Sequence, residues 1–149
     1  MKENRVLSKN KVEENITFFD RWARTYDKPL FQFWMRRFYR PALKIIDGGK
    51  VLDVSCGTGE FLRELATKKK IKLYGTDISS QMIAKAQKKL GNQVQLQKAD
   101  VHNLPFRDNY FDYAVSTESF HHYYDQRRAL QEMKRVTKTG GKVIVVDIN

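Results

Sequence analysis

The sequence predicts an α/β fold built around one mostly parallel sheet. Over residues 50–146, short runs of β-branched and aromatic residues alternate with stretches that have the periodicity of amphipathic helices. Strands that alternate with helices form βαβ units, whose crossover connections are right-handed. The 149 residues have the length of one domain, and a hydrophobic fraction of 41% is enough for a packed core.

Five strands are expected in this sheet, each bounded by residues that favour turns. They cover residues 51–54, 72–77, 94–97, 111–115 and 142–146. The fifth strand is expected to be entered through Gly140 and Gly141.

Three helices are expected between the strands: residues 60–68, a helix that ends near Leu90, and residues 125–137. Ser79 and Ser80 are suitable N-cap residues, because a serine oxygen can accept a hydrogen bond from the first helical turn. The predicted apolar face of the last helix consists of Leu130, Met133 and Val136.

Residues 11–46 also have helical periodicity, with apolar residues at three- and four-residue steps. Pro29 and Pro41 are expected to break this region into pieces, because proline lacks the amide hydrogen that a helix interior requires. We therefore expect a helical segment at residues 1–46 and a sheet-containing core at residues 47–149.

The ends of the first three strands carry residues suited to hold a nucleoside. Ligands of open parallel sheets bind outside the carboxyl ends of the strands. Asp53 lies in the first strand, and the run from Ser55 to Gly59 allows a tight turn before a helix with free N–H groups. Asp77 follows the second strand, where a carboxylate can accept hydrogen bonds from ribose hydroxyls. Asp100 follows the third strand, where it can accept from an adenine amino group.

Each of these aspartates alone also fits a turn or a helix cap, but together they favour a nucleoside site. A P-loop needs Gly-x-x-x-x-Gly-Lys-Ser/Thr, and the sequence contains no such run. A dinucleotide-binding loop needs a third glycine three residues after the second, and Leu62 occupies that position. The loop therefore favours a nucleoside without a pyrophosphate.

The order and spacing of the motifs carry a family resemblance. Residues 51–59 read Val-Leu-Asp-Val-Ser-Cys-Gly-Thr-Gly, and residues 75–79 read Gly-Thr-Asp-Ile-Ser. Further motifs follow at residues 98–106, 111–122 and 135–142. This series resembles the class I S-adenosylmethionine-dependent methyltransferases, in the ubiquinone- and menaquinone-biosynthesis branch (methyltransferase type 11).

The resemblance implies a Rossmann-like, doubly wound sheet that binds S-adenosyl-L-methionine and releases S-adenosyl-L-homocysteine. Asp53 is then expected to hold the methionine part with the glycine loop, Asp77 the ribose and Asp100 the adenine. Tyr26 lies in a segment similar to the family's N-terminal region and is expected to close over the cofactor, so that residues 1–46 form a lid. The remaining expected contacts are Ser55, Cys56, Gly57, Thr58, Gly59, Ile78, Met82, Val101, His102 and Thr117.

The expected activity is methyl transfer to a small-molecule acceptor. His121 and His122 follow the fourth strand, where the methyl group should point, and an imidazole suits proton abstraction near neutral pH. They are the candidate catalytic residues. The alternative for this pair is that one ring packs and the other faces solvent.

Three features depart from the family pattern. Ser55 stands where many members have glycine, and Thr139 replaces the usual proline before two glycines. The family's sheet has seven strands, whereas this sequence ends at Asn149, before strands six and seven. The fifth strand is then an open apolar edge, which predicts a shortened form of the fold or a homo-oligomer that covers the edge.

Two other functions stay open at this point. The net charge of +11 suits an RNA-directed methyltransferase. However, the basic residues are spread along the chain without an RNA-recognition motif, which favours a solvated basic surface. Methylation of bases or amides is marked by an Asn/Asp-Pro-Pro-aromatic sequence, and residues 116–120 read Ser-Thr-Glu-Ser-Phe instead. The second alternative is a shortened cofactor-binding module without turnover.

The cysteine and histidine counts limit the remaining classes. A single cysteine, Cys56, cannot form an internal disulfide, which fits a reducing compartment. With one cysteine and three histidines, no metal site is expected. The charged N-terminus lacks the apolar core of a secretion signal, and no run approaches the roughly 18 apolar residues of a membrane span, so a cytoplasmic protein is expected.

Overall fold

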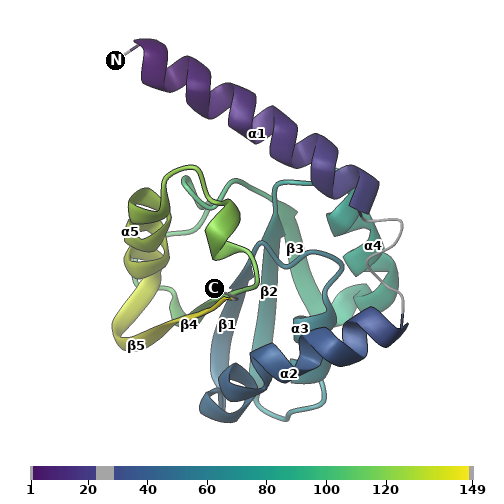
Figure 1. The fold of residues 1–149 in the computed structure, drawn as a ribbon. Helices are drawn as coiled ribbons and strands as arrows, with labels where there is room; N and C mark the ends of the chain where they lie inside the picture. The colour runs from purple at the N-terminus through teal and green to yellow at the C-terminus, as the bar shows by residue number, and fades with distance from the viewer. Residues whose placement is uncertain (1, 23–28, 148–149) are drawn as a thin grey trace.

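The computed structural model describes residues 2–22 and 29–147, and a five-stranded parallel sheet forms its centre (Figure 1). The strands are β1 (Gly49–Val54), β2 (Ile71–Asp77), β3 (Val94–Lys98), β4 (Phe111–Thr117) and β5 (Thr137–Val146). They lie in the order β3-β2-β1-β4-β5, and every neighbouring pair is parallel. The strand order reverses between β1 and β4. The predicted Rossmann-like, doubly wound α/β fold is confirmed.

Four helices of the described residues flank this sheet on its two faces, and the N-terminal helix lies across the ends of the strands. They are α1 (Lys2–Trp22), α2 (Pro29–Ile45), α3 (Glu60–Leu65), α4 (Ser80–Leu90) and α5 (Gln126–Val136), with 3₁₀ turns η1 (Gly91–Gln93) and η2 (Phe120–His122). Apolar side chains of α2, α3 and α4 pack on one face, and those of α5 pack on the other. Ser79 is the N-cap of α4, since its hydroxyl accepts from the Met82 amide, as predicted.

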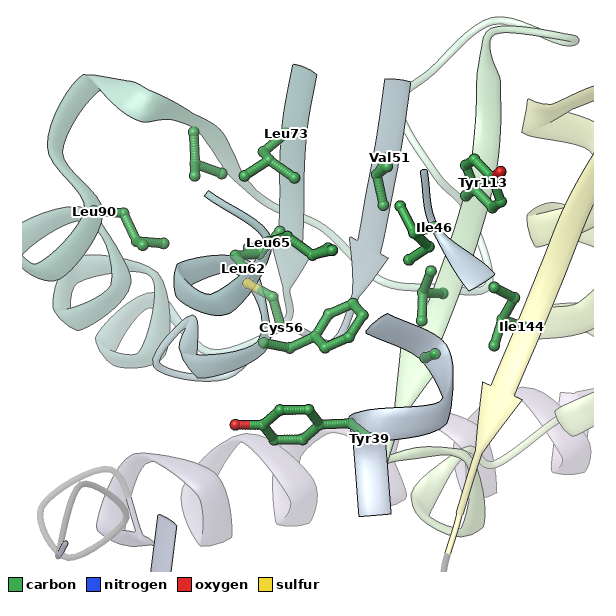
Figure 2. Packing of buried hydrophobic residues seen from close by; sticks show 14 of the residues in the cluster. Tyr39, Ile46, Val51, Cys56, Leu62, Leu65, Leu73, Leu90, Tyr113 and Ile144 are labelled. Carbon is green, nitrogen blue, oxygen red and sulfur yellow. The ribbon is translucent and has the colours of Figure 1, made fainter. Parts of the chain in front are cut away.

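Two apolar clusters, one on each face of the sheet, make up the core. In β1, Val51 belongs to the cluster with α2, α3 and α4, whereas Leu52 and Val54 pack with α5. Successive side chains of a strand point to opposite faces, so this central strand is buried on both sides. Figure 2 shows the first cluster, in which Ile46 and Leu62 lie on the same side of the sheet as Val51.

Pro41 does not break the N-terminal helical region, contrary to the prediction. Pro29 begins α2, a position where the missing amide hydrogen is not needed, but Pro41 lies inside the helix. Ala42 and Ile46 are completely buried in the first cluster and hold the end of α2 against the sheet. Their burial offsets the roughly 3 kcal/mol that an interior proline costs a helix.

The buried face of α5 also differs from the predicted one. Leu130 is 40% exposed, whereas Ala129 and Glu132 are buried together with Met133. Helical periodicity in the sequence predicts that Leu130 lies on the buried face of this helix. Glu132 takes a buried position instead, because partners from the loop after β3 and from Arg135 satisfy its carboxylate.

β5 begins earlier than predicted, at Thr137, directly after α5. The two glycines that were expected to precede it therefore lie within it. Thr137 is paired with Phe111, but the next pair joins Lys142 to Tyr113, so the strand contains a register shift. An irregularity of this kind absorbs extra residues in one strand of a pair.

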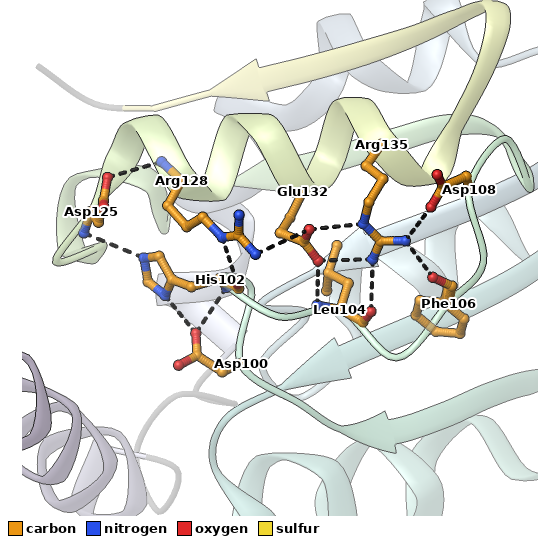
Figure 3. Close-up of polar contacts among 9 residues, drawn as sticks. All are labelled: Asp100, His102, Leu104, Phe106, Asp108, Asp125, Arg128, Glu132 and Arg135. Carbon is orange, nitrogen blue, oxygen red and sulfur yellow. Dashed lines mark hydrogen bonds and ion pairs between the residues drawn. The ribbon is translucent and has the colours of Figure 1, made fainter.

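A polar network ties the loop after β3 to α5 (Figure 3). The Glu132 carboxylate accepts from the Leu104 amide at 2.8 Å and from the Arg135 guanidinium at 2.8 Å. Arg135 also donates to the backbone oxygens of Leu104 and Phe106 and to the carboxylate of Asp108. This loop begins next to the predicted adenine site, so α5 fixes one wall of that site.

α1 lies across the carboxyl-end side of the sheet (Figure 1). Asn15 donates from its side-chain amide to the backbone oxygen of His122 at 3.1 Å, and Asp20 accepts from the Ser79 hydroxyl. These contacts join the N-terminal helix to the loops after β2 and β4. None of the helices in residues 2–22 and 29–147 is long and apolar enough to cross a membrane.

Candidate functional site

A cavity lies at the carboxyl ends of the strands, beside α1. Its walls come from the loops after β1, β2, β3 and β4 and from α1, α2 and α4. Ten of the predicted residues line it: Ser55, Gly57, Asp77, Ile78, Met82, Asp100, Val101, His102, His121 and His122. The cavity therefore lies where the strand order reverses, which is the expected ligand position in this type of sheet.

The other predicted residues lie behind or beside this cavity. Asp53, Thr58 and Gly59 are buried and do not belong to its lining. Cys56 and Thr117 line a smaller cavity next to it. Tyr26 lies outside the described residues, so its predicted role stays a prediction.

α1 contributes a wall that sequence reasoning did not assign residue by residue. Val12, Asn15 and Phe19 all line the cavity. Phe19 is part of the apolar stripe of the helix. Periodicity alone does not distinguish a residue that lines a cavity from one that packs in a core. The contact of this helix with the site follows from the tertiary structure.

The loop after β1 turns through left-handed backbone conformations. Ser55 has a φ of 58°, a region that usually favours glycine, and its hydroxyl lies 3.0 Å from the hydroxyl of Tyr123. Gly59 has a φ of 83°, and a Cβ there would lie 2.7 Å from the Leu90 Cδ1 atom. The second glycine of the loop is therefore required by both backbone conformation and close packing against α4.

Asp77 joins the loops after β1 and β2 at the cavity wall. Its two oxygens accept from the backbone amides of Gly57 and Ser79, each at 2.8 Å. Burial raises the pKa of Asp77 to about 6, although these backbone hydrogen bonds act in the opposite direction. Each carboxylate oxygen has two lone pairs, so capacity for ligand hydroxyls remains.

Asp53 is a buried carboxylate behind the glycine loop. It is 1% exposed, and within the described residues neither of its oxygens has a hydrogen-bond partner. Burial, and then the nearby charge of Asp77, raise its pKa well above the ordinary value. A buried carboxylate without a partner is costly, which indicates that a polar or cationic group completes this position.

Asp100 is held by aromatic neighbours from two loops. One of its oxygens accepts from the His102 amide at 2.9 Å and lies 2.5 Å from the Nδ1 atom of the same residue, and the other accepts from the Tyr124 hydroxyl. Burial acts to raise the pKa of Asp100, but the hydrogen bonds from His102 lower it below the ordinary value. The His102 and Tyr124 rings are stacked at 3.7 Å. The site thus has a fixed acceptor beside a flat aromatic surface.

The two histidines after β4 have different surroundings. The Asp147 carboxylate accepts from the His121 amide at 2.7 Å and lies 2.6 Å from its Nδ1 atom. His122 instead packs edge-to-face against Phe19 at 5.1 Å, and burial lowers its pKa. A carboxylate at Nδ1 fixes the orientation of an imidazole, so His121 has the arrangement of an oriented base.

Glu118 is a cavity residue that sequence reasoning missed. It follows β4 directly, has a φ of 57°, and lines both the main cavity and its smaller neighbour. Both carboxylate oxygens are buried and lack a hydrogen-bond partner among the described residues. Burial, and then the charge of Asp147, raise its pKa. The sequence signal that could have identified Glu118 is its position directly after a predicted strand, which is the criterion that selected Asp77. No group of three or more His, Cys, Asp or Glu side chains in the described ranges is arranged to hold a metal ion.

Comparison with known proteins agrees with this geometry. Residues 52–145 match a protein family described as a methyltransferase domain. The chain belongs to the class I S-adenosylmethionine-dependent methyltransferases. The matched part of this methyltransferase domain contains the glycine loop and the aspartates and histidines that line the cavity.

Curated relatives place the methyltransferase domain in the ubiquinone and menaquinone branch. It is 34% identical over 141 residues to the demethylmenaquinone methyltransferase of Thermotoga maritima, covering 89% of this chain and 61% of the relative. It is 32% identical over 153 residues to the enzyme of that name from Bacillus mycoides, covering 95% and 65%. The chain thus spans less than two thirds of the length of these relatives.

Solved structures share the fold of the methyltransferase domain. A protein from Pyrococcus horikoshii aligns with a TM-score of 0.72 at 29% identity, over 80% of this chain and 58% of the other. A SAM-dependent methyltransferase from Thermotoga maritima aligns with a TM-score of 0.70 at 30% identity, over 87% and 60%.

Proposed function

We propose that this protein transfers a methyl group from S-adenosylmethionine to a small-molecule acceptor. The observation that carries the proposal is the convergence of Gly57, Asp77 and Asp100, from the ends of three strands, on one cavity. Asp77 also holds the glycine loop by a hydrogen bond, so the loop and the carboxylate form one unit. Family membership supports the same activity.

The residues of the site fit the polar groups of this cofactor. The unpartnered oxygens of Asp53 suit the methionine end together with the loop from Gly57 to Gly59. The free lone pairs of Asp77 suit the two ribose hydroxyls. Asp100 suits the adenine amino group, between the apolar side chains of Ile78 and Val101.

The N-terminal segment is proposed as the lid of this site. Asn15 and Phe19 from α1 already form part of the cavity wall. Residues 1–46 would then cover the cofactor, with Tyr26 closing over it, while residues 47–149 hold it. Covering the site excludes water and fixes the orientation of the bound groups.

When bound, the cofactor's sulfonium supplies an electrophilic methyl group. The chain contributes mainly by holding the acceptor in line with that methyl group, an effect worth up to about 7–11 kcal/mol in favourable cases. His121, held by Asp147, is the first candidate to accept the proton that the acceptor loses. His122 is the second candidate, and its lowered pKa keeps its ring neutral and able to accept a proton.

Calorimetry with S-adenosylmethionine and S-adenosylhomocysteine tests the proposal. We expect saturable binding of both, weakened at least about tenfold in Asp77→Ala and in Asp53→Ala, since each removes a charged hydrogen-bonding group. Asp112→Ala is the matched control, because Asp112 lies near the start of β4, pairs with Lys138 and does not line the cavity. Formation of S-adenosylhomocysteine with a panel of acceptors, beginning with reduced quinones, then tests turnover. A folded chain that binds neither compound would contradict the proposed function.

A further inference from the structure

We propose that Glu118 binds an ammonium group inside the cavity. This inference rests on the proposed function and adds the kind of group that the site recognises. The ammonium belongs either to the methionine part of the cofactor or to an amine acceptor, and the experiment below separates these two sources.

The first support is the unpaired state of the Glu118 carboxylate. Both oxygens are buried, and neither has a hydrogen-bond partner among the described residues. Buried carboxylates in folded proteins are normally paired with a cation or with several donors, because an isolated buried charge is costly. A ligand that enters the cavity is in a position to supply the missing partner, since Glu118 is part of the lining.

The second support is the charge of the cavity lining. The chain as a whole has a net charge of +11, yet no lysine or arginine is among the described residues that line the cavity. Asp77, Asp100 and Glu118 are in that lining. Asp100 accepts hydrogen bonds from the His102 amide and the Tyr124 hydroxyl, and Asp77 accepts from backbone amides, so Glu118 is the lining carboxylate that lacks a hydrogen-bond partner among the described residues.

The third support is the backbone of Glu118. A glutamate with a φ of 57° is in a sparsely populated region, so the surrounding structure must hold it there. Its amide donates to the backbone oxygen of Val146 at 2.7 Å, which fixes the loop after β4 to the end of β5. The conformation is thus maintained by the sheet, and it keeps the side chain at the cavity.

An ammonium fits this position better than a neutral donor. Glu118 lies near both Asp147 and His121, whose effects on it oppose each other, so its own unpaired carboxylate is what favours a cation over a hydroxyl. Aromatic side chains of Phe19, Tyr123 and Tyr124 also line the cavity, and aromatic faces attract cations.

The first arm of the test measures binding to wild type and to Glu118→Gln by calorimetry. S-adenosylhomocysteine carries an ammonium group, and 5′-methylthioadenosine lacks it but keeps the nucleoside. If Glu118 binds the cofactor's ammonium, the variant weakens S-adenosylhomocysteine binding by roughly 10- to 100-fold and leaves 5′-methylthioadenosine binding unchanged.

The second arm uses tyramine, an aromatic amine, with the protein saturated in S-adenosylhomocysteine. If Glu118 binds the ammonium of an acceptor, the variant leaves both nucleosides unchanged and weakens tyramine binding by the same factor. p-Cresol, which lacks the amine, should show no difference between wild type and variant.

Controls keep the two proposals distinguishable. Glu64→Gln removes the same charge from a residue outside the cavity, paired with Arg36, and should change neither arm. Thermal unfolding of Glu118→Gln should show a folded protein at least as stable as wild type, because the unpaired charge is removed. The Glu118 proposal would be overturned if Glu118→Gln bound S-adenosylhomocysteine as tightly as wild type does and also bound tyramine as tightly as wild type does. A wild-type protein that binds no nucleoside would overturn the proposed function. Tyramine binding measured without nucleoside would then test Glu118 separately: weaker binding by Glu118→Gln would support its role, and equal binding would overturn it.

Discussion

The acidic side chains at the strand ends carry the same carboxyl group, but their surroundings shift its pKa in different directions. Burial raises the pKa of Asp77 to about 6, whereas hydrogen bonds from His102 lower the pKa of Asp100. The pKa values of Asp53 and Glu118 are both raised, and both side chains lack a hydrogen-bond partner among the described residues. Environment therefore divides these carboxylates into a fixed acceptor (Asp100), a titrating acceptor (Asp77) and two that lack a hydrogen-bond partner among the described residues (Asp53 and Glu118).

Cofactor binding is expected to weaken as the pH falls through about 6. In the ligand-free protein Asp77 becomes protonated there, and a neutral carboxyl accepts ribose hydroxyls less strongly. Calorimetric titration with S-adenosylhomocysteine from neutral to mildly acidic pH measures the effect. Asp77→Asn should bind more weakly throughout and lose this part of the pH dependence. An unchanged pH profile in Asp77→Asn would show that another group titrates.

At the scale of elements, the contact between α5 and the loop after β3 holds one wall of the site. Glu132 is 3% exposed and is satisfied by Leu104 and Arg135 (Figure 3). Arg135 reaches three further groups of the same loop: the backbone oxygens of Leu104 and Phe106 and the carboxylate of Asp108. A short helix thereby orders a long connection that has little regular structure.

Glu132→Gln is expected to lower the free energy of unfolding by about 1–3 kcal/mol, because one buried donor loses its acceptor. Asp108→Asn is the comparison, since it removes an exposed partner of the same arginine and should cost less than about 1 kcal/mol. Urea unfolding measures both. The pKa of Glu132 is lowered, chiefly by Arg135, so its contribution is present above the ordinary glutamate pKa and is lost as the pH falls. Equal effects of both variants would contradict the role of the buried carboxylate.

At the scale of the whole molecule, the sheet has one apolar edge strand at β5. β4 is its neighbour on one side, and no strand in the described residues pairs with the other side. Val143 and Val145 are 38% and 36% exposed. Exposed apolar edge strands promote association, and natural proteins often protect them with lysine.

Val143→Lys is therefore expected to reduce self-association of the chain. Sedimentation velocity over a series of protein concentrations measures the effect. Leu130→Lys is the matched control, because Leu130 is 40% exposed but belongs to α5 and not to the edge strand. A wild-type chain that stays monomeric throughout the series would contradict the expected homo-oligomer.

The sequence by itself determined the fold class, the order of the strands and helices in the chain, and most residues of the candidate site. These features depend on local signals: alternation in strands, helical periodicity, glycines in a tight turn and acidic residues at strand ends. The rule that ligands bind at the carboxyl ends of parallel strands then brought Asp53, Asp77 and Asp100 into one hypothesis without any coordinates. Boundaries were less certain, as Pro41 and the start of β5 show.

Only the tertiary structure decided the environment of each side chain. His121 is paired with Asp147, which lies 26 residues away, and Glu132 is buried by a loop 28 residues away in sequence. The environment of Glu118, with both oxygens buried and without a hydrogen-bond partner among the described residues, is also visible only in the tertiary structure. Burial and pairing depend on segments that the sheet brings together from distant parts of the chain, and no local pattern records which segments meet.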